Sequence, residues 1–251
     1  MIKKGQITIF IIVAIFIVGI IIGFFVIKNY VKTGEIPSSF DSFQNSFLSC
    51  LEYTSNEGIY YIAKHGGYYD VPFESSIIYF TEDIPYYYLN SINYVPSISI
   101  VEKELGKYIS SNLEGCLFLE NFEGQGFSIN VEEYSILTEI SNGNINVKML
   151  NTLTVSKGND TTQFRNLEVD LNYNLKNLHT TSKEIVEMYS KNPGAICLTC
   201  LEEISEKNNV EITASPVLDV SIFENDIIWF FINSKDDVSE DKLIWVFVVE
   251  Q

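Results

Sequence analysis

Residues 127–175 carry the pattern that decides the fold: FSINVEEYSILTEISNGNINVKMLNTLTVSKGNDTTQFRNLEVDLNYNL. Short runs of alternating apolar and polar residues fill this stretch, which is typical of strands with one buried face. Asn142-Gly143 and Gly158-Asn159-Asp160 interrupt the runs, and both favour the tight turns of β-hairpins. The stretch therefore predicts a β-meander.

Helical spacing of apolar residues returns on both sides of the meander. A helix is expected from about Ser39 to the Gly66-Gly67 pair, because glycine can adopt the left-handed conformation that closes a helix. Three more helices and three strands are expected at Ser97–Asn112, Ser182–Lys191 and Ala195–Asn208, and at 210–218, 221–233 and 242–250. We therefore predict an α+β domain at residues 39–251, with a mostly antiparallel sheet packed by several helices.

An uncharged apolar stretch, Ile7–Ile27, precedes all of these elements. As a helix it would extend about 31 Å at about 1.5 Å per residue, which matches a hydrocarbon core of about 30 Å. It is longer than the apolar part of a cleaved signal peptide. We expect one transmembrane helix at residues 7–27, between a cytoplasmic leader at 1–6 and a linker at 28–38.

Two glycines inside the apolar stretch, Gly19 and Gly23, form a G-x-x-x-G pattern. Small residues at this spacing let two membrane helices approach closely. Besides the lipid bilayer, the expected partners are therefore a second copy or another surface protein. Chance glycines in a long apolar helix explain the pattern equally well.

The rest of the chain is strongly acidic. The net charge is −17 at pH 7, and all 33 Asp and Glu residues follow residue 34. Such a surface repels the phosphates of nucleic acids and anionic lipids, so no nucleic-acid partner is expected. The lysines on the two sides of the apolar stretch barely differ in number, so they indicate little about orientation. We expect the domain to be extracytoplasmic, although an acidic cytoplasmic domain would have the same composition.

The amino terminus reads KKGQITIF at residues 3–10. This segment resembles the leader of archaeal type IV pilin-like proteins, in which a prepilin peptidase cuts after such a glycine. The resemblance implies processing between Gly5 and Gln6. Phe10 stands where pilins usually carry a glutamate that pairs with the neighbouring subunit, and a simple signal anchor is the alternative.

The remainder of the chain resembles a family of uncharacterised archaeal single-pass membrane proteins. The stretches that carry the resemblance are SCLEYTSNEGIYYIAKHGGYY, IPYYY, EKELGKYISSNLEGCL and NPGAICLTCLEEISEK. They cover both cysteine-containing regions and most of the expected helices. The resemblance implies a membrane location and brings no activity with it.

The four cysteines, Cys50, Cys116, Cys197 and Cys200, all lie in the acidic domain. An even number in an exported domain favours disulfides. Three pairings are possible, and Cys50–Cys116 with Cys197–Cys200 is preferred because the second pair is close in sequence. Free buried thiols are the alternative.

Tyrosine is concentrated between Tyr53 and Tyr94, and includes the run Tyr86, Tyr87 and Tyr88. On a strand, three consecutive rings must place at least one ring on each face. Tyr combines contact area with a polar tip, so this run is a candidate partner-binding site; packed sheet aromatics are the alternative. Asn159 is a candidate glycosylation acceptor within Asn159-Asp160-Thr161.

Motifs of enzymes and of cofactor or metal sites are missing from the sequence. No H-E-x-x-H, G-x-S-x-G or phosphate-binding glycine loop occurs, so no catalytic residue, cofactor or metal is predicted. The leading hypothesis is a membrane-anchored, non-enzymatic cell-surface protein with a structural, attachment or binding role, or a divergent pilin-like subunit. The alternative is an envelope thiol-disulfide oxidoreductase using Cys197 and Cys200, whose neighbours Ile196, Leu198 and Leu201 suggest a buried pair.

Overall fold

The computed structural model of the chain describes residues 17–18, 38–79, 81–130, 133–216, 227–237 and 241–250. The chain divides into two compact units, Met1–Ser42 and Phe43–Gln251, and every strand of the described ranges lies in the second unit. The expected leader, Gly5, Gln6, Gly19 and Gly23 lie outside the described residues.

The expectation of a membrane-spanning helix in the fold is corrected. Within the described ranges, no helix combines the length and the apolar character needed to cross a bilayer. The two longest described helices each bury one face and expose charged side chains on the other. The stretch predicted to span, residues 7–27, lies outside the described residues except for Ile17 and Val18.

The described helices follow the sequence pattern in part, since α5 begins well before the expected Ser182 and α4 was not predicted. Their bounds are η1 Ser38–Phe40, α2 Asp41–Lys64, η2 Phe73–Ser75, α3 Ile98–Leu117, α4 Leu119–Glu123, α5 Leu175–Tyr189 and α6 Leu198–Asn208. Helix α2 closes where predicted, because Gly66 and Gly67 have φ angles of +54° and +85° and the Gly67 N–H donates back to the Ile62 carbonyl at 2.6 Å. Helix α3 begins at a serine cap, since Ser97 Oγ accepts the N–H of Ile100 at 3.4 Å.

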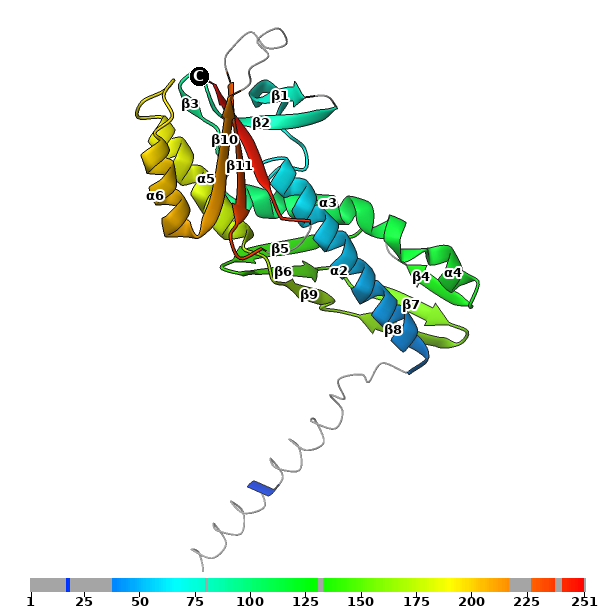
Figure 1. The fold of residues 1–251 in the computed structure, drawn as a ribbon. Coiled ribbons are helices and arrows are strands. Elements are labelled where there is room, and N and C mark those ends of the chain that lie inside the picture. Colours follow the sequence, from blue (N-terminus) through cyan, green and yellow to red (C-terminus); the bar gives the residue numbers. More distant parts are fainter. Residues whose placement is uncertain are drawn as a thin grey trace, which may run out of the picture. The chain divides into compact units, whose positions relative to one another are not determined.

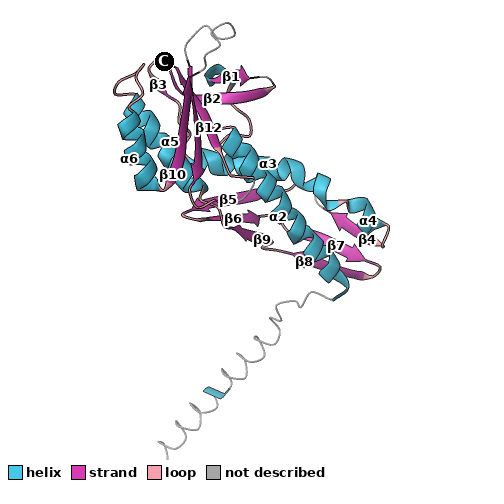
Figure 2. Cartoon of the chain, viewed as in Figure 1, coloured by secondary structure: helices cyan, strands magenta, loops and turns pink. Residues whose placement is uncertain are grey.

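The strands form three sheets (Figures 1 and 2). The large sheet has the order β1-β2-β12-β11-β10, and β3 also pairs with β2. Its strands are β1 Ser76–Tyr79, β2 Glu82–Leu89, β3 Ile92–Asn93, β10 Val210–Pro216, β11 Ile227–Ser234 and β12 Trp245–Glu250. Two small antiparallel sheets have the orders β4-β7-β8 and β5-β6-β9, with β4 Phe127–Asn130, β5 Ile136–Ser141, β6 Asn144–Met149, β7 Leu153–Lys157, β8 Asp160–Phe164 and β9 Glu168–Leu171.

The expectation of one mostly antiparallel sheet is therefore also corrected. The meander of residues 127–175 forms two separate sheets, and strands β2 and β12 of the large sheet run parallel. A parallel pair needs a long crossover between its strands, and here most of the domain lies between them. Local alternation predicts that a strand exists, but it does not identify the strand's partner. The class is α+β with mixed sheets.

The large sheet packs helices against one of its faces. Helix α5 contacts β11 and β12, and α6 contacts β10; Figure 1 shows both helices beside these strands. The side chains on this covered face include Phe230 and Phe247, which stack at 5.2 Å between ring centroids, and Trp245; all three are buried.

A second core joins helices α2 and α3 to the small sheets. Phe43 of α2 lies 5.1 Å from Phe122, 6.1 Å from Phe127 and 5.7 Å from Phe164, measured between ring centroids. The disulfide Cys50–Cys116 links α2 to α3 near this cluster. The apolar residues that predicted the helices and strands therefore meet in these two cores.

Candidate binding groove and disulfide sites

The tyrosine run predicted as a binding site lies on β2 and divides between the two faces, as its spacing required. Tyr87 is fully buried, and its hydroxyl donates to the Gly66 carbonyl at 2.7 Å. Burial raises the pKa of Tyr87 well above its ordinary value. Tyr88 packs edge-on against Tyr189 of α5, since the pairing of β2 with β12 shifts register there. Only Tyr86 packs on the opposite face of the sheet, and it is half-buried.

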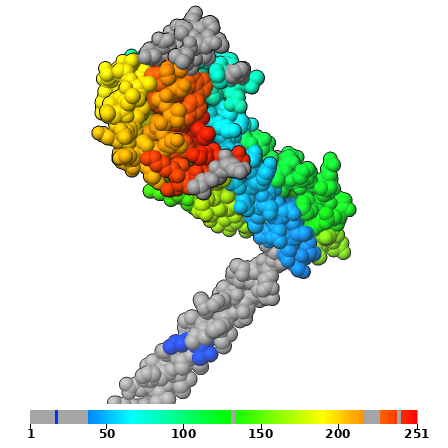
Figure 3. Space-filling model, viewed as in Figure 1, coloured from blue at the N-terminus to red at the C-terminus, as the bar shows by residue number. Residues whose placement is uncertain are grey.

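That opposite face carries a groove of about 670 Å³, which we call the aromatic groove. It is lined by Lys64, Tyr79, Glu82, Ile84, Ser215, Pro216, Trp229, Phe231, Ile244 and Val246. The Trp229 ring contacts Tyr79 edge-on at 4.9 Å and stacks on Phe231 at 6.0 Å, measured between centroids. In Figure 3 the strands near the C-terminus, coloured orange and red, form part of the molecular surface beside α5 and α6.

The register of the strands explains how the groove forms. Trp229 pairs with Val248, and Phe231 pairs with Val246, so these four side chains share one face. On β10, the partners of Trp229 and Phe231 are the small polar residues Ser215 and Thr213. Large side chains beside small ones leave a hollow.

Sequence reasoning missed most of this groove. The signal was present in IIWFFIN at residues 227–233, where large apolar residues occupy both faces of one strand. In a sheet with helices on one face only, such a strand leaves an apolar face without a helix over it. Because the sequence did not show which helices cover which face of the sheet, it favoured the tyrosine run over residues 227–233 as the partner-binding site.

The groove carries charges of both signs. Among the described residues that line it, Glu82 is the one acid and Lys64 the one base. Burial and then the Glu250 carboxylate raise the pKa of Tyr86, and the raised pKa of Tyr61 has burial as its main cause and the charge of Glu82 as a smaller one. Glu82 therefore lines the groove itself, and the Glu250 carboxylate lies near Tyr86 of β2.

The disulfide pairing predicted first is the one found, with Cys50–Cys116 and Cys197–Cys200. The two bonds differ in setting. Cys50 is buried, with 4% of its surface exposed, and its bond joins residues 66 positions apart. Cys197 and Cys200 are both half-buried at the start of α6.

The expectation of a buried Cys197–Cys200 pair is wrong in one respect. Leu201 packs inside, but Leu198, between the two cysteines, is 72% exposed. Leu198 is the first residue of α6, and its side chain is exposed although it lies only three positions before the buried Leu201. Cys197 is the N-cap of the helix, and its Sγ accepts the N–H of Cys200 at 3.2 Å.

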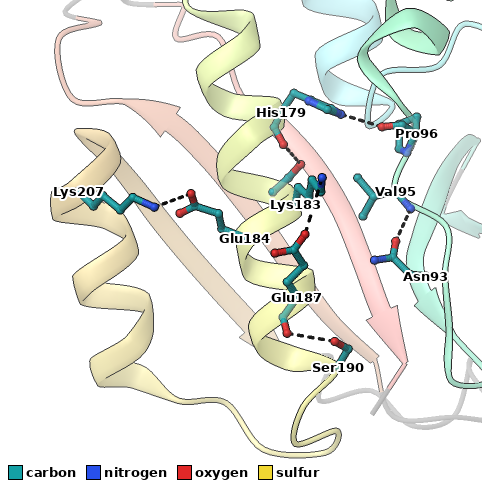
Figure 4. Close-up of polar contacts among 10 residues, drawn as sticks. Asn93, Val95, Pro96, His179, Lys183, Glu184, Glu187, Ser190 and Lys207 are labelled. Carbon is teal, nitrogen blue, oxygen red and sulfur yellow. Dashed lines mark hydrogen bonds and ion pairs between the residues drawn. The ribbon is translucent and has the colours of Figure 1, made fainter.

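The two histidines make structural contacts. His65 stacks on Tyr61, and its Nδ1 lies 2.8 Å from the Tyr61 carbonyl oxygen. His179 donates from Nε2 to the Pro96 carbonyl at 2.7 Å (Figure 4). Burial lowers the pKa of His179, which favours the neutral ring. Over the ranges that the structure describes, no group of three His, Cys, Asp or Glu side chains could hold a metal ion.

Asn159 lies exposed in the turn between β7 and β8, where Gly158 has a φ of +61°. This position leaves the side chain open to solvent, and glycosylation there stays a prediction.

No protein-family model, curated protein or solved structure matches the chain. The resemblance to archaeal pilin-like membrane proteins therefore stays a prediction from the sequence.

Proposed function

We propose that this chain is a cell-surface protein that binds a segment of a partner protein in the aromatic groove. The groove carries this proposal: its volume of about 670 Å³ lies in the range of ligand sites, and its walls are mostly apolar and aromatic. Tyr and Trp are enriched where proteins recognise one another. Among the described residues that line the groove there is no histidine or cysteine that could act as a catalytic base or nucleophile.

The two disulfides support a location outside the cytoplasm. Disulfides persist where the surroundings are oxidising and are rare where thioredoxin and glutathione keep thiols reduced. The exposed turn at Asn159 fits the same location.

Charge favours a partner segment that is basic as well as apolar. The chain carries a net charge of −17, so its field attracts cations and raises their rate of encounter. The rings of Tyr79 and the half-buried Phe231 can contact the cationic group of Lys or Arg through cation–π interactions. A second copy of this chain is the poorer occupant, because two such charges would repel each other.

Calorimetric titration of the full chain with short synthetic peptides tests the proposal. One peptide alternates lysine with phenylalanine, and its counterpart has glutamate in place of lysine. We expect binding of the basic peptide only, with an affinity that falls as salt is added. Equal binding of both peptides, or of neither, would overturn the proposal.

A matched pair of variants locates the binding. Tyr79 lines the groove and is 42% exposed, whereas Tyr53 is 61% exposed on α2 and is not among the lining residues. Tyr79→Ser should weaken binding about tenfold, equivalent to about 1.4 kcal/mol, and Tyr53→Ser should leave it unchanged. If both variants bind like the parent, the groove is not the site.

A further inference from the structure

We propose that Cys197–Cys200 is an exchangeable disulfide that oxidises a dithiol of a partner protein. The bond lies at the first turn of α6, and both cysteines are half-buried next to the exposed Leu198. This inference does not depend on the aromatic groove.

The helix stabilises negative charge on one of the two sulfurs. The backbone N–H of Cys200 donates to Cys197 Sγ at 3.2 Å, and Thr199 Oγ1 lies 3.6 Å from the same sulfur. Unpaired N–H groups at a helix start favour a negatively charged partner. Cys197 is therefore the better leaving group when the disulfide is attacked, because a stabilised thiolate leaves faster.

The exchange balances in two steps. A thiolate of the partner's dithiol attacks Cys200 Sγ, and the electron pair of the S–S bond leaves on Cys197 Sγ. The partner's second thiolate then attacks the partner sulfur of the mixed disulfide, and the electron pair leaves on Cys200 Sγ. The partner is oxidised to a disulfide, and the chain accepts two electrons and two protons as Cys197 and Cys200 become thiols.

Residues around the Cys197–Cys200 disulfide are exposed to solvent. The segment before it, from Lys191 to Ala195, is exposed, as are Leu198 and Thr199. Leu198 gives an unfolded or extended substrate an apolar contact directly beside the bond. The substrate class that fits is a cysteine-containing segment of another exported protein.

Helix α6 does not need the disulfide to stay in place. Lys207 forms an ion pair with Glu184 of α5 at 2.7 Å, and Asn208 donates to the same carboxylate at 2.9 Å; Figure 4 shows the lysine reaching across to α5. Asn177 of α5 also donates to the Asn208 carbonyl at 2.7 Å. The far end of α6 is thus anchored while its first turn changes redox state.

The second disulfide provides an internal control. The native full chain would be treated with dithiothreitol, alkylated at intervals and mapped by mass spectrometry. We expect labelling of Cys197 and Cys200 at least about tenfold faster than labelling of Cys50 and Cys116, because Cys50 is buried although Cys116 is half-buried. Equal rates, or labelling of all four cysteines only after denaturation, would overturn the proposal.

Single variants test the assigned roles. After reduction, Cys200→Ser retains Cys197, and Cys197→Ser retains Cys200; the remaining thiol is timed with a chromogenic aromatic disulfide. Cys200→Ser should react at least about tenfold faster, because the backbone N–H at position 200 is still present to stabilise the Cys197 thiolate. Equal rates, or a faster reaction of Cys200, would contradict the assignment.

Oxidation of a substrate is the final requirement. Under nitrogen, the native chain should convert a reduced peptide with two cysteines to its disulfide, and the variant with both Cys197 and Cys200 changed to serine should not. Leu198→Ser should slow this exchange, whereas Tyr79→Ser should not affect it. If the native chain leaves the peptide reduced, the proposal for Cys197–Cys200 is wrong, and the proposal for the aromatic groove is unaffected.

Discussion

The indole N–H of Trp245 donates a hydrogen bond to the hydroxyl of Tyr87 at 3.1 Å, across 158 residues of sequence. That hydroxyl in turn donates to the Gly66 carbonyl at 2.7 Å. The chain of bonds joins β12, β2 and the end of α2, and each of its groups is buried. It stabilises the parallel pairing of β2 with β12, and these two strands carry Ile84 and Val246 of the aromatic groove.

Tyr87→Phe should therefore lower the free energy of unfolding by about 1–3 kcal/mol, because two buried partners lose their hydrogen bond. Urea unfolding of the full chain measures the change. Tyr53→Phe, at a ring 61% exposed, should cost less than about 0.5 kcal/mol. Equal effects at the two sites would mean that the buried bonds contribute nothing.

Gly67→Ala should destabilise the fold more than Gly126→Ala. Both glycines have left-handed φ angles, +85° and +86°, so both variants carry a backbone cost of about 1–2 kcal/mol. A methyl at Gly67 would lie 2.8 Å from Val101 Cγ2 and 3.0 Å from Trp245, whereas nothing lies within 4 Å at Gly126. Thermal or urea unfolding should show an additional cost of about 1–3 kcal/mol at Gly67 alone.

Removal of the disulfide Cys50–Cys116 should cost about 4 kcal/mol of stability in the chain-entropy model, because the bond closes a long loop. Removal of Cys197–Cys200, which closes a loop of a few residues, should cost about half as much. Double serine variants compared by urea unfolding check the order. If removal of Cys197–Cys200 costs more stability than removal of Cys50–Cys116, the main structural role belongs to the half-buried Cys197–Cys200 bond.

Acidification should weaken the fold through His179. Burial, together with the charge of Lys183, lowers the pKa of this ring in the folded state, although its bond to the Pro96 carbonyl opposes the shift. The unfolded state therefore takes up a proton first as pH falls below about 6.5, so stability is lost on the acid side of that value. The loss between pH 7 and pH 5 should be smaller in His179→Asn, measured by urea unfolding at each pH.

The mature amino terminus tests the resemblance of residues 3–10 to a pilin-like leader. Processing after Gly5 would leave Gln6 as the first residue, and intact-mass spectrometry of protein from its native host measures this directly. A chain beginning at Met1 or Ile2 excludes prepilin processing.

Much of the local structure could be predicted. The Gly66-Gly67 helix end and the Asn142-Gly143 hairpin follow from glycine's access to positive φ, which is a property of single residues. The disulfide pairing also agreed with prediction, because sequence proximity left little choice for Cys197 and Cys200. The exposure of Leu198 did not follow, because it depends on how far the first turn of α6 extends beyond the rest of the domain.

By itself, the sequence determined most of the helices and strands and the acidic charge, because these depend on neighbouring residues and on composition, but it did not indicate α4 or the first half of α5. Only the tertiary structure decided that β2 lies parallel to β12, that Tyr87 and Tyr88 are core residues, and that Trp229 and Phe231 line a groove. Strand partners distant in sequence are chosen by the packing of whole faces, and α5 and α6 cover only one face of the large sheet. The groove is a consequence of that choice.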